Sequence, residues 1–261
     1  MKINNKNRSK IRLLIPIGVT LLALQGCGPY KAHPGDSNYD PYAVQDPVEG
    51  ANRASFWLFE IIDNLFLKPA ATAWTGFAPE PVQKGVRNFL TNLKTPVVLV
   101  NQVLQGKISA AGETIARFGA NTLGGIGGLV DVASHQGIPK HEEDFGQTLG
   151  VWGLKEGPYL FFPFLGPSSV RDATGRIVDF FFDPLNIYAA VNRREHITYI
   201  RVAATAIDER GQLLKVGKEI EERTKDLYAT VRDVWWQRQV HKLYDGNPPD
   251  VITEADEDLF D

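Results

Sequence analysis

The sequence predicts an all-α fold. Apolar residues recur at helical spacing in several segments, and proline stands near the start of three of them, at positions 47, 81 and 96. No run of alternating apolar and polar residues is long enough to predict a strand. With 261 residues, of which 43% are hydrophobic, the chain can build one large core or two small ones.

The first predicted helix covers residues 52–67. Asp46 is expected to be an N-cap before Pro47, and Glu49 follows three residues later, as in a capping box. Apolar side chains cover most of the circumference of this helix. We therefore expect it to be buried or in contact with lipid nearly all round.

Further helices are predicted at 79–93, from Pro96 to Leu104, and at about 109–122. The last of these runs into the segment 124–128, which contains four glycines. Each glycine would cost about 1 kcal/mol relative to alanine inside a helix. The segment therefore indicates a close approach of two backbones or a break in the helix.

The second half of the body is more apolar and more often interrupted. Glycine and proline punctuate residues 145–167, and the apolar segment 177–191 is broken at Asp183-Pro184. Residues 199–243 are predicted as two helices separated near Gly211. After Cys27, no apolar segment reaches the roughly 18 uninterrupted residues that indicate a membrane-spanning helix.

The N-terminus has the three parts of an export signal. Five Lys and Arg residues precede an apolar run at 13–24, which is shorter than the roughly 20 residues that span a bilayer. The run ends in Leu24-Gln25-Gly26-Cys27, which resembles the site cut by lipoprotein signal peptidase. We expect a diacylglycerol and an N-acyl chain on Cys27, the only cysteine; an incidental buried thiol is the alternative.

Lipoproteins retained in the inner membrane tend to carry aspartate after the lipidated cysteine, whereas Gly28 stands there in this chain. The expected location is therefore the outer membrane, on its periplasmic side, with the protein held by its lipid. One anchor of several acyl chains holds a protein far more firmly than a single myristoyl chain.

Four segments follow from these observations: a signal peptide at 1–26, a flexible tether at 27–45, a helical body at 46–246 and a disordered acidic tail at 247–261. The full chain has 28 Lys and Arg against 31 Asp and Glu, and cleavage would remove five of the cations. This acidic balance argues against a nucleic-acid partner.

The sequence contains no convincing catalytic site, and we predict that the protein is not an enzyme. Ser168 and Ser169 lack the Gly-x-Ser-x-Gly pattern of a nucleophile elbow. His135 and His141 lack metal-ligand spacing and lie near Gly137 and Pro139, which favours a solvated loop, so no metal is expected. We assign no catalytic residues and no cofactor other than the covalent lipid.

Several blocks together resemble the MlaA (VacJ) family of outer-membrane lipoproteins. The most specific are Asp-Phe-Gly-Gln-Thr-Leu-Gly at 144–150 and Gly-Pro-Ser-x-x-Arg-Asp at 166–172. Further matching blocks lie at 46–53, 88–93, 100–107, 124–133 and 157–159. The resemblance covers about 46–246, nearly the entire predicted body.

This resemblance implies a single ring-shaped bundle of short amphipathic helices, embedded in one leaflet of the outer membrane, with a central amphipathic channel. Such proteins remove misplaced phospholipids from the outer leaflet and so maintain lipid asymmetry. The lipids pass to a soluble periplasmic carrier that feeds an inner-membrane ABC transporter, and family members also bind trimeric porins. Short helices with internal backbone hydrogen bonds are compatible with an apolar medium.

Two sets of residues are candidates for this role. Polar side chains within apolar helices are predicted to line or brace the lipid path: Asn52, Arg53, Asn88, Asn92, Asn101 and Arg117. For each, a helix cap or a buried hydrogen-bonded side chain is an equal alternative. Gly150, Gly153 and Gly157 are predicted to form a mobile loop that gates the path, so that bulkier residues at 153 and 157 change lipid flux while leaving stability nearly constant.

Two other functions remain open at this stage. One is a lipoprotein with phospholipase-type hydrolase activity, which would need an activated nucleophile such as Ser168 or Ser169. The other is a scaffold that only holds a porin or another envelope partner. It would bind no lipid of its own.

Overall fold

The computed structural model describes residues 44–248. The predicted signal peptide, Cys27, the tether up to residue 43 and the tail beyond residue 248 lie outside the described residues. No helix in the described part of the chain is long and apolar enough to cross a membrane. We refer to residues 44–248 as the helical body.

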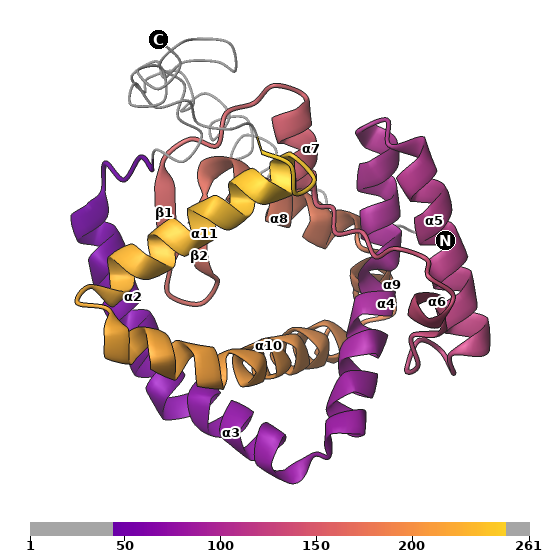
Figure 1. Cartoon of the computed structure of the whole chain (residues 1–261), viewed down its shortest axis with the longest axis horizontal. Coiled ribbons are helices and arrows are strands. Elements are labelled where there is room, and N and C mark those ends of the chain that lie inside the picture. The colour runs from indigo at the N-terminus through magenta and orange to yellow at the C-terminus, as the bar shows by residue number, and fades with distance from the viewer. Residues whose placement is uncertain (1–43, 249–261) are drawn as a thin grey trace, which may run out of the picture. The chain divides into compact units, whose positions relative to one another are not determined.

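The helical body is built from α-helices, two π-helical turns and one hairpin (Figure 1). In chain order they are α2 (Glu49–Ile62), η3 (Asp63–Leu67), α3 (Lys68–Phe77), α4 (Glu80–Leu104), α5 (Ile108–Gly119), η4 (Ala120–Gly124), α6 (Val132–His135), α7 (Phe145–Val151), β1 (Tyr159–Phe162), β2 (Gly166–Ser169), α8 (Val170–Phe182), α9 (Pro184–Val191), α10 (His196–Arg223) and α11 (Leu227–Leu243). The prediction of a mostly helical fold is confirmed.

The hairpin is an exception to the predicted all-α fold. β1 and β2 pair antiparallel, with Tyr159 opposite Ser169 and Phe162 opposite Gly166. Tyr159 and Phe161 are buried, whereas Leu160 and Phe162 are half-buried. Because neither face of β1 is fully solvated, its sequence is apolar throughout and lacks the alternation that would have revealed a strand.

An aromatic cluster forms the main hydrophobic core. It joins α2, β1 and α11 through Phe56, Tyr159, Phe161, Tyr228, Trp235, Trp236 and Val240. The rings of Phe56 and Phe161 meet edge to face, with centroids 5.2 Å apart. Distant parts of the chain are thus held together by ring packing.

The predicted N-cap at Asp46 is wrong. Helix α2 begins at Glu49 with Val48 as its N-cap, and no side chain caps it. The carboxylate of Asp46 instead accepts hydrogen bonds from Asn52 Nδ2 (2.8 Å) and from the hydroxyl of Tyr228. The side chain of Asp46 therefore connects α2 to α11, whereas the local sequence predicted that it would cap α2.

Two predicted helix boundaries are also wrong. Pro96 does not begin a helix but lies inside α4, where the next residues, Val97 and Val98, are buried. Gly211 does not separate two helices but lies inside α10 against α3: an added Cβ there would be 2.9 Å from Thr75 Cγ2. Packing keeps both helices continuous, whereas the predicted break at Asp183-Pro184 is confirmed, because Asp183 caps α9.

Candidate functional site: an apolar exterior and a polar interior

The helical body exposes many large apolar side chains. The most exposed are Phe77 (90%), Leu123 (89%), Phe164 (81%) and Val191 (75%). Soluble monomers rarely expose contiguous apolar patches of more than a few hundred Å². Such residues therefore indicate surfaces that contact something other than water.

Helix α3 has the reverse of the polarity expected for a helix in water. Its exposed residues are Pro69, Thr72, Ala73, Gly76 and Phe77, none of which is charged, and its single charged residue, Lys68, lies at its first position. Its opposite side packs on α10, where Trp74 Nε1 donates to Asp208 Oδ1 (3.3 Å). A helix at a water-facing surface would instead bury its apolar stripe.

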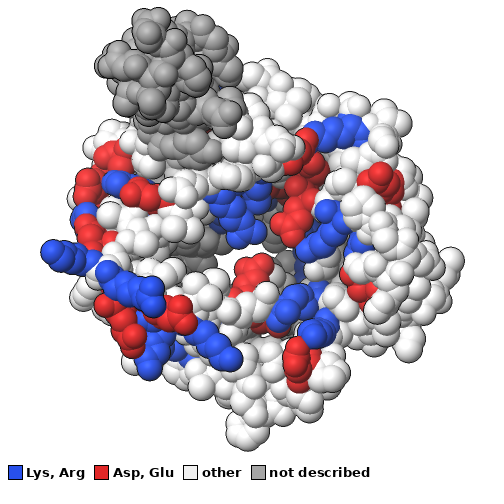
Figure 2. All heavy atoms as spheres, in the orientation of Figure 1, with Lys and Arg blue, Asp and Glu red and all other residues white. Residues whose placement is uncertain are grey.

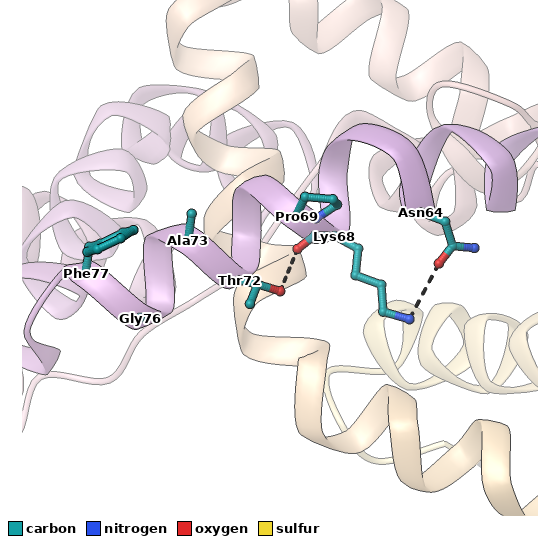
Figure 3. A pocket seen from close by; sticks show the side chains of 7 residues that line it. All are labelled: Asn64, Lys68, Pro69, Thr72, Ala73, Gly76 and Phe77. Carbon is teal, nitrogen blue, oxygen red and sulfur yellow. Dashed lines mark hydrogen bonds between the residues drawn. The ribbon is translucent and has the colours of Figure 1, made fainter.

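A groove of about 770 Å³ runs over this exposed side of α3 (Figure 3). Its apolar floor contains Pro69, Ala73 and Gly76, and Phe77 lies at one end. At the other end Lys68 Nζ donates to Asn64 Oδ1 (3.5 Å). The groove has the size of a small-molecule site and the polarity of a hydrocarbon contact.

Buried ion pairs lie on the interior side of α10 and of η3, the π-helical turn that precedes α3. Asp208, on α10, is 4% exposed and accepts hydrogen bonds from Arg87 Nε (2.9 Å) and Gln212 Nε2 (2.9 Å). Asp63, on η3, is 6% exposed and pairs with Arg210. Hydrogen bonds to Asp63 raise the pKa of Arg210. The strongest polar contacts of these helices therefore point inward.

One face of the helical body is hollowed between α10 and α11, the two helices that flank the gap in Figure 1. Figure 2 shows side chains of both charge signs around this hollow. Zwitterionic groups are the ligands that such a mixed surface would suit, because both of their charges find a partner.

The predicted path residues on α2 brace the core. Asn52 is 4% exposed; its amide donates to Tyr159 O (3.0 Å) and accepts from Phe161 N (2.9 Å). Arg53 donates to both carboxylate oxygens of Asp226 (3.1 and 2.6 Å), and its guanidinium lies 4.4 Å from the ring centroid of Tyr228. Both side chains join α2 to other elements of the body.

The asparagines of α4 make similar contacts. Asn88 Nδ2 donates to Leu129 O (3.3 Å), and Asn92 Nδ2 donates to Thr122 Oγ1 (3.0 Å). Asn101 is 2% exposed and donates to Asp179 Oδ1 (2.9 Å). These contacts connect α4 to three different neighbours.

Arg117, on α5, donates from Nη2 to both oxygens of Asp131 (2.8 and 2.9 Å). Burial of Asp131 opposes ionisation, but hydrogen bonds from Ser134 and Asn121 lower its pKa to about 2. All six predicted path residues are thus paired, and the structure distributes them over several junctions rather than bringing them together. Their role in lining a path stays a prediction.

Both alternatives predicted for 124–128 are found, because η4 ends at Gly124 and the backbone of Gly125 lies close to that of Val130. An added Cβ at Gly128 would lie 2.6 Å from Asn92, and one at Gly125 would lie 2.1 Å from Val130 O. A side chain at Gly125 would meet backbone atoms, and one at Gly128 would meet the side chain of Asn92 and would be strained by the positive φ of 97°. The glycine cluster therefore packs the end of η4 against α4.

The predicted gate glycines are not equivalent. Gly150 lies in α7, where an added Cβ would be 2.6 Å from Leu243 Cδ1 and 2.8 Å from Arg171 Nη1. Gly153 and Gly157 have positive φ angles of 92° and 74°. Side chains at both positions would be strained, so the expectation of nearly constant stability on substitution is wrong. The gating role itself is still a prediction.

Ser168 and Ser169 serve as structural hydroxyls. Both are buried; Ser168 Oγ donates to Asp172 Oδ2 (2.7 Å), and Ser169 Oγ caps α8 by accepting from Asp172 N (3.0 Å). Ser169 also donates to Glu156 Oε1 (2.5 Å), and burial raises the pKa of Glu156. The two serines are 1% and 0% exposed, so their hydroxyls join β2 to its neighbours inside the fold and do not face a surface that a substrate could reach.

His141 lies beside a second cavity of about 850 Å³, between the start of α5 and the end of α11. Its Nε2 is 2.6 Å from Glu113 Oε2. Lys107 pairs there with Glu143 (2.9 Å) and Asp245 (2.5 Å). Within residues 44–248, no group of His, Cys, Asp and Glu side chains is arranged to hold a metal ion.

Sequence reasoning missed the buried carboxylates that organise the interior, namely Asp63, Asp183 and Asp208. A signal was available for Asp208, because it directly follows the uncharged stretch 202–207. A charged residue is rarely buried without a partner. The identity of that partner, however, depends on the tertiary fold.

The fold and surface together define a class: a helical protein that exposes many large apolar side chains and buries ion pairs. A model of the "MlaA lipoprotein" family matches residues 44–242. The chain therefore belongs to the MlaA lipoprotein family, which confirms the resemblance seen in the sequence. It is a family of transport lipoproteins, in agreement with the prediction that the protein is not an enzyme.

Three similar proteins support this assignment. The intermembrane phospholipid transport system lipoprotein MlaA of Escherichia coli K12 is 33% identical over 235 residues, covering 88% of this chain and 87% of its own. The protein of the same description from Haemophilus influenzae is 28% identical and covers 95% and 100%. A solved structure described as the "structural basis for maintenance of bacterial outer membrane lipid asymmetry" has a TM-score of 0.67 at 32% identity, covering 78% and 100%.

Proposed function

We propose that this protein removes mislocalised phospholipids from the outer leaflet of the outer membrane and passes them toward a periplasmic carrier, which maintains lipid asymmetry. Its membership of the MlaA lipoprotein family supports this function, as do the descriptions of the Escherichia coli and Haemophilus influenzae relatives. The observation that carries the proposal is the reversed polarity of α3, which exposes Phe77 and turns Trp74 inward to Asp208.

The helical body would be embedded in one leaflet, as a ring around an amphipathic channel. Its helices keep their backbone hydrogen bonds internal, as hydrocarbon requires, and many of their outward side chains are large and apolar. The hollow between α10 and α11 would be the mouth of the channel, where charges of both signs could accompany a phospholipid head group (Figure 2).

The lipid anchor is assigned to Cys27, with a diacylglycerol and an N-acyl chain. As a member of a lipoprotein family the protein carries a lipid, and Cys27 is the single cysteine available. The anchor would sort the protein to the periplasmic side of the outer membrane and orient it there. A body that is itself embedded should remain with membranes when Cys27 is replaced by alanine in a form exported by a cleavable signal.

The proposed partners are a trimeric porin in the outer membrane and a soluble periplasmic lipid carrier that feeds an inner-membrane ABC transporter. These follow from the place of the family in an intermembrane phospholipid transport system. We propose no nucleic-acid partner, because the sequence is acidic overall, with a formal charge of −3.

The decisive experiment measures outer-leaflet phospholipid in cells that lack the protein. We expect it to rise, and to return to normal on complementation with the wild-type chain. A lipid phenotype that fails to appear on deletion would contradict the proposal. It would favour a scaffold that holds an envelope partner without handling lipid.

A second arm tests the hydrolase alternative. Purified protein should release no fatty acid from phospholipid vesicles, and Ser168→Ala should leave lipid asymmetry intact if the chain still folds. Release of fatty acid that is lost in Ser168→Ala or Ser169→Ala would replace transport with hydrolysis. Thermal unfolding of each variant separates loss of fold from loss of chemistry.

A further inference from the structure

The tip where α9 turns into α10 combines exposed apolar side chains with two arginines. Val191, Tyr199 and Ile200 are 75%, 71% and 65% exposed, and they flank the turn at 192–195. Arg193 and Arg194 stand on that turn and are themselves exposed. Cations set between apolar and aromatic groups are typical of surfaces that lie at a membrane interface.

The inner side of this helical pair is polar and well paired. Arg201 Nη1 donates to Asp183 Oδ2 (2.7 Å), and Thr198 Oγ1 donates to Asn186 Oδ1 (3.0 Å). Asp183, Asn186 and Thr198 are all buried. Because polar side chains hold α9 against α10, the apolar ones are left on the outside, and the exposure follows from the fold.

The turn itself is held in one conformation. Arg193 has a positive φ of 54°, and Arg194 N donates to Ala189 O (2.7 Å). Asn192 Nδ2 also donates to Tyr188 O (2.8 Å). These hydrogen bonds connect the turn to the end of α9, and both arginines on it are exposed.

The two arginines differ from most others in the helical body. Arg53, Arg87, Arg117, Arg171, Arg176, Arg201, Arg210 and Arg232 each pair with a carboxylate. Within residues 44–248, neither Arg193 nor Arg194 forms an ion pair, although Glu195 follows them in sequence. Two guanidinium groups are therefore available for an external anion.

We propose that the α9–α10 tip binds the phosphates of anionic phospholipids at the membrane surface, with Arg193 and Arg194 on the head groups and Val191, Tyr199 and Ile200 in the acyl region. The guanidinium fork matches phosphate oxygens in geometry and charge. The inference rests on the proposed function only in that it places the helical body in a membrane. It adds a preference for anionic lipid at one named site.

Charge complementarity selects the occupant. An apolar protein partner would leave both arginines desolvated without a counter-ion, whereas a membrane of anionic lipid satisfies the cations and the apolar groups together. Each basic residue near an anionic surface strengthens binding by about fivefold. Loss of both should therefore remove most of the selectivity.

The test places a fluorophore on Val191→Cys in the full lipidated protein, in which acylation blocks the thiol of Cys27. The protein is placed in nanodiscs of equal amounts of phosphatidylcholine and phosphatidylglycerol. Two samples are compared: in one the phosphatidylcholine carries brominated acyl chains, and in the other the phosphatidylglycerol does. Brominated chains quench a nearby fluorophore. Stronger quenching by brominated phosphatidylglycerol reports local enrichment of the anionic lipid.

We expect this preference in the wild-type background and a drop of about fivefold or more in Arg193→Gln/Arg194→Gln. Arg223→Gln, at the opposite end of α10 and also exposed, is the matched control and should retain the preference. Equal quenching by both lipids in the wild-type background, or no quenching by either, overturns the proposal. Outer-leaflet phospholipid measured in cells separates this result from the transport function, which can fail while the preference persists.

Discussion

Asp63 and Arg210 form a two-point ion pair across 147 positions of sequence, with Nε–Oδ1 and Nη2–Oδ2 distances both 2.8 Å. The side chains are 9% and 15% exposed. The pair fixes the junction of α2 and α3 against α10, next to the inward contacts of Trp74 and Arg87 with Asp208. It is one of several buried ion pairs that keep polar groups inside the body while apolar groups face outward.

Removal of one partner should destabilise the protein strongly. Asp63→Asn leaves the guanidinium of Arg210 nearly buried without its counter-ion, which costs roughly 3–5 kcal/mol for a buried pair. Equilibrium unfolding of each variant in detergent micelles measures its free energy of unfolding. Lys218→Gln, which breaks the exposed pair with Glu222 (3.8 Å), should cost less than about 1 kcal/mol. An equal loss of unfolding free energy in the two variants would mean that the buried pair contributes no more than an exposed one.

Gly211 should tolerate no larger side chain. Valine there would press on Thr75 Cγ2, 2.9 Å from the added Cβ, and should cost about 1–3 kcal/mol by overpacking. Gly217→Ala on the same helix meets its nearest neighbour, Arg210 Nη1, only at 3.6 Å and should gain up to about 1 kcal/mol from helix propensity. The difference in melting temperature between the two variants checks the close packing of α3 on α10.

The gating idea can be separated from backbone strain. Gly153→Ala and Gly106→Ala both place a side chain at positive φ, 92° and 75°, with no atom within 4 Å of the new Cβ. Each should cost about 1 kcal/mol in stability. If the loop gates lipid passage, only Gly153→Ala should also change the rate of phospholipid removal in cells. Identical transport in both variants would rule out a gate at this glycine.

Stability should depend on Asp131 below pH 4. Its folded pKa of about 2 lies below the usual 3.8, so ionised Asp131 stabilises the folded state above pH 4, and this contribution disappears as the pH falls toward 2. Asp131→Asn removes the effect. Its free energy of unfolding should be lower at pH 7 and should fall less between pH 4 and pH 2 than in the wild type. A parallel pH dependence of the two proteins would show that Asp131 is not responsible.

The exterior of α3 should govern membrane retention when the anchor is absent. In a Cys27→Ala background, Phe77→Asp should shift the protein from the membrane fraction toward the soluble fraction, because a charge replaces a side chain that is 90% exposed. Lys84→Asp, at an exposed position beside Glu80, should leave the distribution unchanged. Release of the Cys27→Ala protein itself into buffer would mean that the body is merely tethered.

Local sequence was sufficient for some elements and not for others. Asp183-Pro184 ends α8 and caps α9 through contacts within three residues, so the break could be read directly. Pro96 and Gly211 disfavour a helix by only a few kcal/mol, and burial of Val97 and the contact with Thr75 outweigh that cost. The β1–β2 hairpin escaped notice because both its faces are partly covered.

The sequence by itself determined the helical character and the family blocks at 144–150 and 166–172, and it predicts a signal that ends at Cys27. Only the tertiary structure decided that Asp46 joins Tyr228 instead of capping α2, and that Asp63 and Asp208 pair inward while Phe77 faces out. The physical reason is the distance along the sequence over which each kind of interaction acts. Helix propensity and capping act within a few residues, whereas the sites of buried charge and exposed hydrocarbon depend on partners more than 100 positions away.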